Sequence, residues 1–188
     1  RTGELAWKVQ RNYKTPREGD HSYSTPIVTK QARRETLLVW GAERFTAHDA
    51  ANGKILWSCA GFNPQKRNNW VVVSSFVKVG DMAVVPYGRG SKLAGIKLGG
   101  KGDVTDSHRT WETGASSFVP TPAAHDSRVY TVRDRGEVLC TNPKTGETFW
   151  KGQFPKDRAS YYSSPSIAEG KIYSAREDGT ELFAVCVD

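Results

Sequence analysis

The sequence is poor in cysteine and has no long hydrophobic run. Its three cysteines, Cys59, Cys140 and Cys186, are far apart, so neither a CxxC motif nor a zinc-ligand spacing is present. No stretch approaches the roughly 20 apolar residues that a membrane-spanning helix needs. An initiator Met and a signal peptide are also lacking, and the start at Arg1 suggests a trimmed or mature segment. The cysteines leave the redox compartment open.

Catalytic motifs are lacking as well. The sequence contains no G-x-S-x-G motif, no phosphate-binding glycine loop and no H-E-x-x-H motif. The four histidines are scattered, and none has a partner at a spacing suited to a metal. No segment keeps a 3.6-residue hydrophobic period, so little helix is expected. We therefore predict neither a catalytic residue nor a metal ligand in this chain.

Internal repeats are the strongest signal in the sequence. Four tryptophans close similar phrases: in the full phrase, which ends at Trp57 and Trp150, Asp or Asn, two residues, Thr or Asn, Gly and three residues precede Trp, while Trp7 ends a shorter phrase and Trp111 a longer variant. Glycine allows the positive φ of the tight turn, and tryptophan buries a large apolar surface on the strand that follows. The predicted structural anchors of the repeat are Trp7, Trp57, Trp111, Trp150, Gly53 and Gly146. Cys140 and Cys186 stand at matching distances before a turn residue, so we expect both to be buried free thiols.

A second phrase recurs upstream of each turn. It reads YSTPIV from Tyr23, VSSFVKV from Val73, VPTPAA from Val119 and YSSPSI from Tyr161. Alternating apolar strands and glycine-containing charged turns follow it, giving four short strands in roughly 40 to 50 residues. The predicted fold class is all-β, a β-propeller of four-stranded blades. The chain holds about four blades' worth, either a segment or half of a larger ring of seven or eight blades.

We expect one propeller domain over residues 1–188. Its blades span approximately 22–58, 70–112 and 118–152, and a split blade combines 160–188 with 2–10. Read head to tail, Asp188 and Arg1 to Trp7 restore the repeat phrase with one turn residue missing. Three arrangements stay open: a closed four-bladed ring, two chains that complete a ring as a homodimer, or part of a longer chain. The glycine-rich insertion Leu98 to Arg109 replaces one short turn and is expected to form a protruding loop.

Charge suggests a partner surface. The formal net charge is +7, and the loops that a propeller places on one face hold more basic than acidic residues. Such a face could attract a protein partner or an anionic ligand. Sequence-specific nucleic-acid binding is not expected, because no matching motif is present. The basic face is predicted to include Lys66, Arg67, Arg89, Arg133, Arg135, Lys156, Arg158 and Arg176.

The combined phrase, S-x-P, two strands and [DN]-x-x-[TN]-G-x-x-x-W, resembles the PQQ-type propeller repeat of quinoprotein alcohol dehydrogenases and BamB-like outer-membrane assembly lipoproteins. A quinoprotein dehydrogenase would be expected to show calcium-binding Glu and Asn residues, a catalytic Asp and an adjacent cysteine pair, and the pair is missing here. The resemblance therefore supports the fold more than PQQ chemistry.

The resemblance implies a non-catalytic binding or scaffold propeller in the periplasm or elsewhere outside the cytoplasm. No cofactor is expected on this interpretation. One alternative is part of a quinoprotein dehydrogenase that binds PQQ with calcium. Another is an accessory or sensor propeller of a larger protein.

Overall fold

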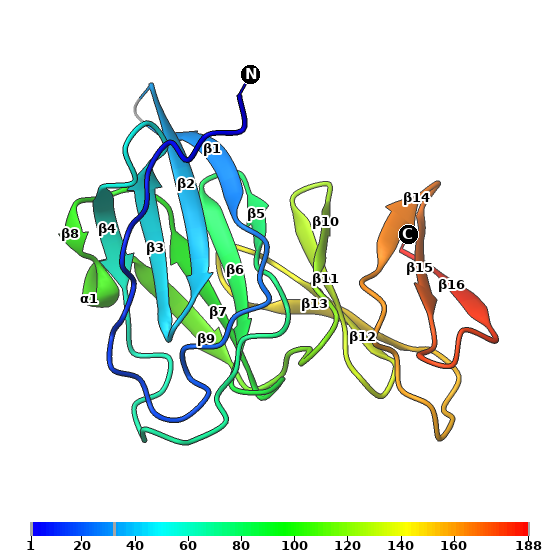
Figure 1. Cartoon of the computed structure of the whole chain (residues 1–188). Helices are drawn as coiled ribbons and strands as arrows, with labels where there is room; N and C mark the ends of the chain where they lie inside the picture. Colours follow the sequence, from blue (N-terminus) through cyan, green and yellow to red (C-terminus); the bar gives the residue numbers. More distant parts are fainter. Residues whose placement is uncertain (1, 32, 188) are drawn as a thin grey trace. The chain divides into compact units, whose positions relative to one another are not determined.

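The structure, a computed structural model, describes residues 2–31 and 33–187. Strands dominate it, and the described residues contain one helix, of four residues (Figure 1). That helix is far too short to cross a membrane, and no other described segment offers a long apolar helix. The elements are β1 (Ile27–Gln31), β2 (Arg34–Gly41), β3 (Arg44–Asp49), β4 (Ile55–Cys59), β5 (Val77–Val79), β6 (Met82–Tyr87), β7 (Lys92–Lys97), β8 (Gly102–Asp103), α1 (Thr105–His108), β9 (Arg109–Thr113), β10 (Ala123–His125), β11 (Arg128–Val132), β12 (Glu137–Thr141), β13 (Thr148–Gln153), β14 (Ser166–Ala168), β15 (Lys171–Ala175) and β16 (Leu182–Cys186).

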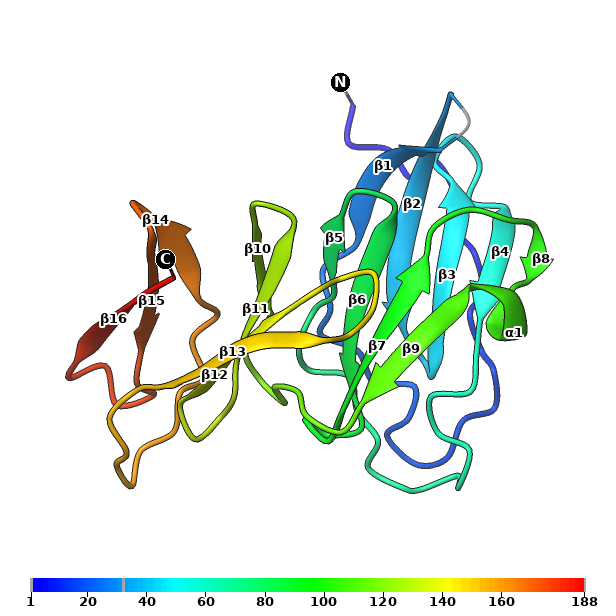
Figure 2. The same ribbon diagram turned by 180° about the vertical axis from the view of Figure 1, so that it is seen from behind.

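The strands form four separate sheets, each built on an antiparallel meander, and β8 is added in parallel to the edge of the first. Their orders are β1-β2-β3-β4-β8, β5-β6-β7-β9, β10-β11-β12-β13 and β14-β15-β16. Figure 2 shows the sheets from behind. The chain divides into two compact units, Arg1–Val72 with Gly99–His108, and Val73–Leu98 with Arg109–Asp188. The second unit thus contains three consecutive repeats.

Several hairpins close with two residues of positive φ. Ala42 and Glu43 (φ 51° and 58°) join Gly41 to its pair partner Arg44. Asp126 and Ser127 (φ 46° and 60°) likewise join β10 to β11. Positive φ at both central residues is the type I′ geometry, whose twist matches that of paired strands. These turns keep the strands of each repeat short and closely paired.

The third strand of the first three sheets lies in the core. Every residue from Val138 to Thr141 on β12 is buried, and the central residues of β3 and β7 are buried too. In the second unit, Val138 and Cys140 form one cluster with Ile172 and Val187 of the last repeat. Adjacent sheets in that unit therefore bury side chains between them, as repeat proteins do.

The expectation that Cys186 is buried is wrong, whereas that for Cys140 is confirmed. Packing rather than strand register explains the difference. Cys140 pairs with Tyr130 in the third sheet, but in the fourth sheet the residue opposite Tyr173 is Ala184. Ala184 is itself exposed, as are Leu182 and Cys186 on the same face of β16, because no other sheet among the described residues covers that face. Its thiol is exposed and free.

The glycine-rich insertion does not protrude. Its residues Gly102 and Asp103 form β8, which pairs in parallel with Trp57 and Ser58 at the edge of β4. The amide of Val104 donates to the carbonyl oxygen of Ser58 at 2.9 Å, and the amide of Ala60 donates to the hydroxyl of Thr105 at 2.8 Å. The insertion therefore covers an edge strand that would otherwise expose unpaired backbone groups.

Two of the repeat tryptophans contact a glycine-containing turn. The indole N–H of Trp111 donates to the carbonyl oxygen of Pro143 at 2.8 Å, and that of Trp7 donates to Ala50 at 3.0 Å. A Cβ on Gly146 or Gly53 would lie 2.7 Å or 2.6 Å from the matching ring. Only glycine leaves room for these ring contacts at the observed positive φ.

The other two tryptophans differ from this pattern. Trp57 is buried and donates to the side-chain oxygen of Gln31 at 3.2 Å, because the insertion replaces its turn. Trp150 is partly buried against Tyr130, with ring centroids 6.0 Å apart. Residues 2–10 form no strand, so the split fourth blade stays a prediction.

Candidate functional site: a basic cleft in the second unit

A cleft of about 430 Å³ lies in the second unit, and we call it the basic cleft. It is formed by the turn between β6 and β7, the segment before β10, the turn between β11 and β12, and the chain that leaves β13. Its lining residues are Arg89, Gly90, Ser116, Phe118, Arg133, Asp134, Arg135, Glu137, Gln153 and Lys156. Four of them are basic and two are acidic, so the cleft carries a positive balance.

Backbone contacts hold the two turns of the basic cleft in place. The amide of Ser116 donates to the carbonyl oxygen of Gly90 at 3.1 Å, and the amide of Phe118 donates to the carboxylate of Asp134 at 3.1 Å. A Cβ on Gly90 (φ +80°) would come within 2.9 Å of the Phe118 nitrogen. Because the segments approach so closely, the lining side chains are presented from fixed positions.

The four cations of the basic cleft are not equally available. Arg133 forms an ion pair with Glu137 and also donates from Nε to the carbonyl oxygen of Ser116 at 3.3 Å. The guanidinium carbon of Arg89 lies 4.4 Å from the centroid of the Phe118 ring. Arg89, Arg135 and Lys156 are all exposed, but the Arg89 guanidinium lies over the Phe118 ring. Arg135 and Lys156 are therefore the best placed to meet an anion that arrives from solvent.

A buried hydroxyl also lines the basic cleft. Ser116 is 2% exposed, and its Oγ has no hydrogen-bond partner among the described residues. A buried polar group without a partner costs free energy unless water or a ligand satisfies it. Ser116 therefore adds a buried hydroxyl without a hydrogen-bond partner to the lining of the basic cleft.

Arg158 lies beside the basic cleft, whereas the charge of Arg176 is already paired with carboxylates and is not available to bind an anion. The carbonyl oxygen of Arg158 accepts a hydrogen bond of 3.4 Å from Arg135. Arg176 forms ion pairs with three carboxylates. Its Nη1 lies 2.6 Å from Oδ2 of Asp157, its Nε lies 3.8 Å from Oδ1 of Asp178, and its Nη2 pairs with Glu181. Desolvation lowers the pKa of Arg176, but the three carboxylates outweigh it and raise the pKa overall. Its charge is neutralised within its own loop.

Lys66 and Arg67, the remaining predicted cations, belong to the first unit. The backbone carbonyl and amide of Arg67 bind the side chain of Asn63, each at 2.9 Å. The Arg67 guanidinium donates to Gln65 at 2.7 Å and its carbon lies 5.3 Å from the Trp70 ring centroid. Both cations are exposed. They form a local basic loop of the first unit, whereas the basic cleft belongs to the second.

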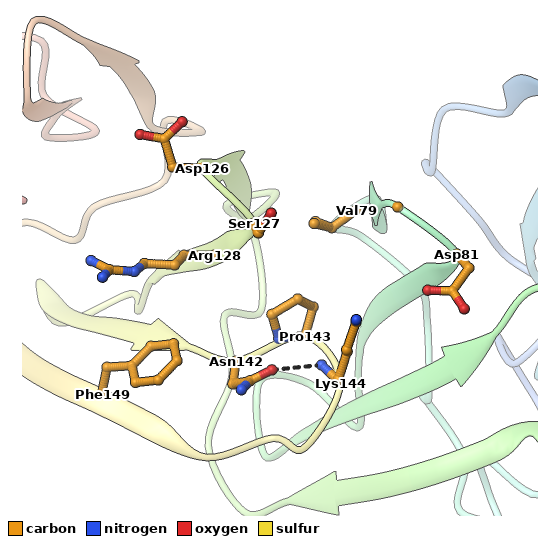
Figure 3. Close-up of a pocket in the computed structure, with 10 residues that line it drawn as sticks. Val79, Asp81, Asp126, Ser127, Arg128, Asn142, Pro143, Lys144 and Phe149 are labelled. Carbon is orange, nitrogen blue, oxygen red and sulfur yellow. Dashed lines mark hydrogen bonds between the residues drawn. The ribbon is translucent and has the colours of Figure 1, made fainter.

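A second cleft, of about 450 Å³, lies at the opposite ends of the strands in the same unit. Figure 3 shows Asp81 and Asp126 on opposite sides of it, with Pro143 and Lys144 between them. The amide of Lys144 donates to the side chain of Asn142 at 2.9 Å. Acidic and basic side chains are mixed here, so this cleft has less preference for one sign of ligand charge.

The sequence did not identify Ser116, Phe118 or Gly90 as members of a site. The sequence pattern around these residues gave little indication of a site, because they lie in a connecting segment and a turn without a recognisable motif. Among residues 2–31 and 33–187, no group of three or more His, Cys, Asp or Glu side chains is placed to hold a metal ion. The chemistry that the basic cleft can perform is electrostatic binding with hydrogen bonding.

Comparisons with known proteins support the repeat assignment. Residues 103–186 match the family model described as outer membrane protein assembly factor BamB. Comparison with curated protein sequences gives no match. Among solved structures, BamB from Moraxella catarrhalis is similar with a TM-score of 0.66 at 16% identity, over 98% of this chain and 50% of that chain.

Two further structures show the same fold. A quinohemoprotein alcohol dehydrogenase, ADHIIG from Pseudomonas putida HK5, has a TM-score of 0.69 at 14% identity, over 98% of this chain and 34% of that one. The computationally designed Ika4 protein has a TM-score of 0.64 at 11% identity, over 99% of both chains. The chain thus spans half the length of the BamB structure. The expected all-β partial propeller is confirmed, and the family-model match supports the PQQ-type repeat over residues 103–186.

Proposed function

We propose that this chain of PQQ-type propeller repeats is a non-catalytic binding or scaffold module whose basic cleft receives an acidic segment of a protein partner. The name of the matching family model, an assembly factor of the outer membrane, supports a protein partner. It also supports a location outside the cytoplasm, which we include in the proposal. A homodimer that completes the ring stays a prediction of the sequence.

The observation that carries the proposal is the combination of charge and hydrogen-bonding capacity in the basic cleft. Arg89, Arg135 and Lys156 border the opening, and the Ser116 hydroxyl lies buried within its lining. Carboxylates bind well to guanidinium groups because charge-assisted hydrogen bonds are stronger than neutral ones. An acidic peptide segment therefore matches this surface better than a basic or apolar one.

Titration with a fluorescent poly-glutamate peptide, followed by anisotropy at low salt, tests the proposal. The variants R135E and K156E reverse the charge of exposed side chains that take part in none of the ion pairs found among the described residues. Each should weaken binding by about tenfold, and added salt should weaken binding by the unaltered chain. K144E is the matched control, because Lys144 belongs to the second cleft. Equal weakening by all three variants, or no saturable binding, would contradict the proposal.

The alternatives from the sequence remain predictions. Part of a PQQ- and calcium-dependent quinoprotein dehydrogenase is supported by fold likeness to ADHIIG, which bears on the fold alone. The described residues supply no cluster of three or more potential metal-binding side chains, so we assign none of them to calcium or PQQ. Calorimetric titration with PQQ and calcium tests this reading, and calcium-dependent one-site binding would favour it. An accessory or sensor propeller of a larger protein is the other alternative.

A further inference from the structure

The basic cleft contains two carboxylates of its own. Its lining includes Asp134 and Glu137 besides the four cations. The carboxylate of Asp134 accepts a hydrogen bond of 3.1 Å from the amide of Phe118, so it helps to hold the backbone of the cleft. The carboxylate of Glu137 instead pairs with the guanidinium of Arg133. Glu137 thus places a carboxylate on one of the cations that an acidic partner would use.

The turn between β11 and β12 holds Glu137 against Arg133. The two residues are four positions apart, and the amide of Arg133 donates to the carbonyl oxygen of Glu137 at 2.8 Å. A group tethered by so short a segment has a high effective concentration at its target, on the order of millimolar. A carboxylate that arrives from solvent must therefore compete with Glu137 for Arg133.

Arg133 also connects this ion pair to the buried serine of the cleft. Its Nε donates to the carbonyl oxygen of Ser116 at 3.3 Å, while its Nη1 pairs with Glu137. The Oγ of the same serine is buried and has no hydrogen-bond partner among the described residues. A carboxylate that replaced Glu137 would therefore bind to a guanidinium that already contacts Ser116.

The ion pair between Arg133 and Glu137 is exposed enough to open. The two side chains are 38% and 29% exposed, so water can solvate both groups when they separate. Arg176 provides the contrast, because its side chain is 9% exposed and pairs with three carboxylates. Separating Arg176 from its partners would leave a largely buried charge unpaired, which is costly. Of these two paired arginines, Arg133 is the one that can exchange its carboxylate.

We infer that Glu137 is an intramolecular competitor in the basic cleft, whose carboxylate covers Arg133 until a carboxylate of an acidic partner displaces it. This inference rests on the proposed function and adds regulation to it, because Glu137 raises the concentration of acidic segment that binding requires. The exposed Arg135 and Lys156 make the first contact with the partner. Arg133 joins the contact only after Glu137 has left it.

Titration of the fluorescent poly-glutamate peptide into the variant E137Q tests the inference. Glutamine keeps the size of the side chain and removes its charge, so the dissociation constant should fall about fivefold relative to the unaltered chain. D157N is the matched control. It removes one negative charge beside Lys156, while Arg176 keeps two other carboxylates, so no cation of the basic cleft is released. Its effect should stay below about twofold.

The outcomes separate this inference from the proposed function. If the unaltered chain binds the peptide and E137Q binds it no more tightly than D157N does, Glu137 is not a competitor and the proposed function stands. If E137Q binds and the unaltered chain does not, Glu137 blocks the cleft completely, and the proposed function fails for the unaltered chain. No saturable binding by either protein overturns both.

A second measurement needs no change at Glu137. The side-chain Nε–H signal of Arg133 in an NMR spectrum can be assigned by its loss in R133K, which keeps the positive charge. This signal should shift as the unaltered chain is titrated with the peptide, because Arg133 exchanges Glu137 for a ligand carboxylate. A signal that stays in place while the peptide saturates the chain would overturn the inference.

Discussion

Trp111 on β9 donates its indole N–H to the carbonyl oxygen of Pro143, which lies in the turn of a different sheet. The ring also lies against Gly146 of that turn and over Gly95 of its own sheet, where a Cβ would collide with the indole. A hydrogen bond and two glycine contacts thus fix one side chain between consecutive repeats. The contacts of Trp7 with Ala50 and Gly53 repeat this arrangement in the first unit.

Replacing Gly146 by alanine should destabilise the chain by about 2 to 4 kcal/mol, because it adds backbone strain at φ +76° to a clash with Trp111. G179A is the matched control. Gly179 has φ +67° but nothing within 4 Å of its Cβ position, so only the backbone cost of about 1 kcal/mol applies. Urea unfolding measures both. Equal losses would show that the contact with Trp111 is unimportant.

Replacing Trp111 by phenylalanine keeps most of the apolar contact but removes the hydrogen bond to Pro143. We expect a loss of about 1 to 2 kcal/mol for W111F and about 3 kcal/mol for W111A. The same unfolding experiment checks the order. If W111F were as damaging as W111A, the hydrogen bond and the shape of the indole, rather than the buried apolar area, would control this position.

His48 should make the stability of the chain depend on pH. Burial lowers the pKa of His48, aided by Arg11 and partly opposed by the hydrogen bond to the carbonyl oxygen of Gly53. That carbonyl can only accept, so Nδ1 carries the proton of the neutral ring. At pH values between the lowered pKa and 6.5, the unfolded chain binds more protons than the folded one. Stability should therefore be lost as the pH falls below about 6.5.

The measurement is the urea midpoint between pH 5 and pH 8 for the unaltered chain and for H48Q. The glutamine side chain retains hydrogen-bonding capacity but does not titrate. The difference between the two proteins should shrink or change sign as the pH falls. A constant difference across this range would show that His48 ionises alike in the folded and unfolded states.

The three thiols should differ in reactivity. Cys186 is exposed, whereas Cys59 and Cys140 are buried, and desolvation raises the pKa of Cys140. A thiol reagent should therefore modify one cysteine per chain rapidly at high dilution, and all three after denaturation. The variant C186S should lose the fast phase. Retention of a fast phase in C186S would show that a buried cysteine becomes accessible by local opening.

The repeat pattern predicted the fold because each repeat satisfies its own strand pairing. The short, largely apolar segment from Val129 to Val132 forms the strand β11, with all four residues buried, and Gly146 fits a turn with positive φ. These are local properties of the chain, so they can be predicted from a single sequence. The docking of Gly102 and Asp103 on β4 is not local, because the partner strand lies more than 40 residues away.

The candidate site was predicted less completely. Arg89, Arg133, Arg135 and Lys156 line one cleft, because turns at the same ends of neighbouring strands lie close together. Arg176 was counted as a free cation because sequence alone did not show that Asp157, Asp178 and Glu181 converge on it. Ser116 gave no signal, since its significance depends on burial and on the missing partner of its hydroxyl.

The pairing of β8 with β4 has a consequence for folding during synthesis. Strands β1 to β4 are complete at Cys59, but the strand that covers their edge ends at Asp103. At roughly 5 to 20 residues per second, the ribosome takes several seconds to supply that strand. During this interval β5, β6 and β7 emerge while the edge of β4 is still open. The backbone of β4 in the first unit can therefore be fully paired only after β5 to β7 of the second unit have been synthesised.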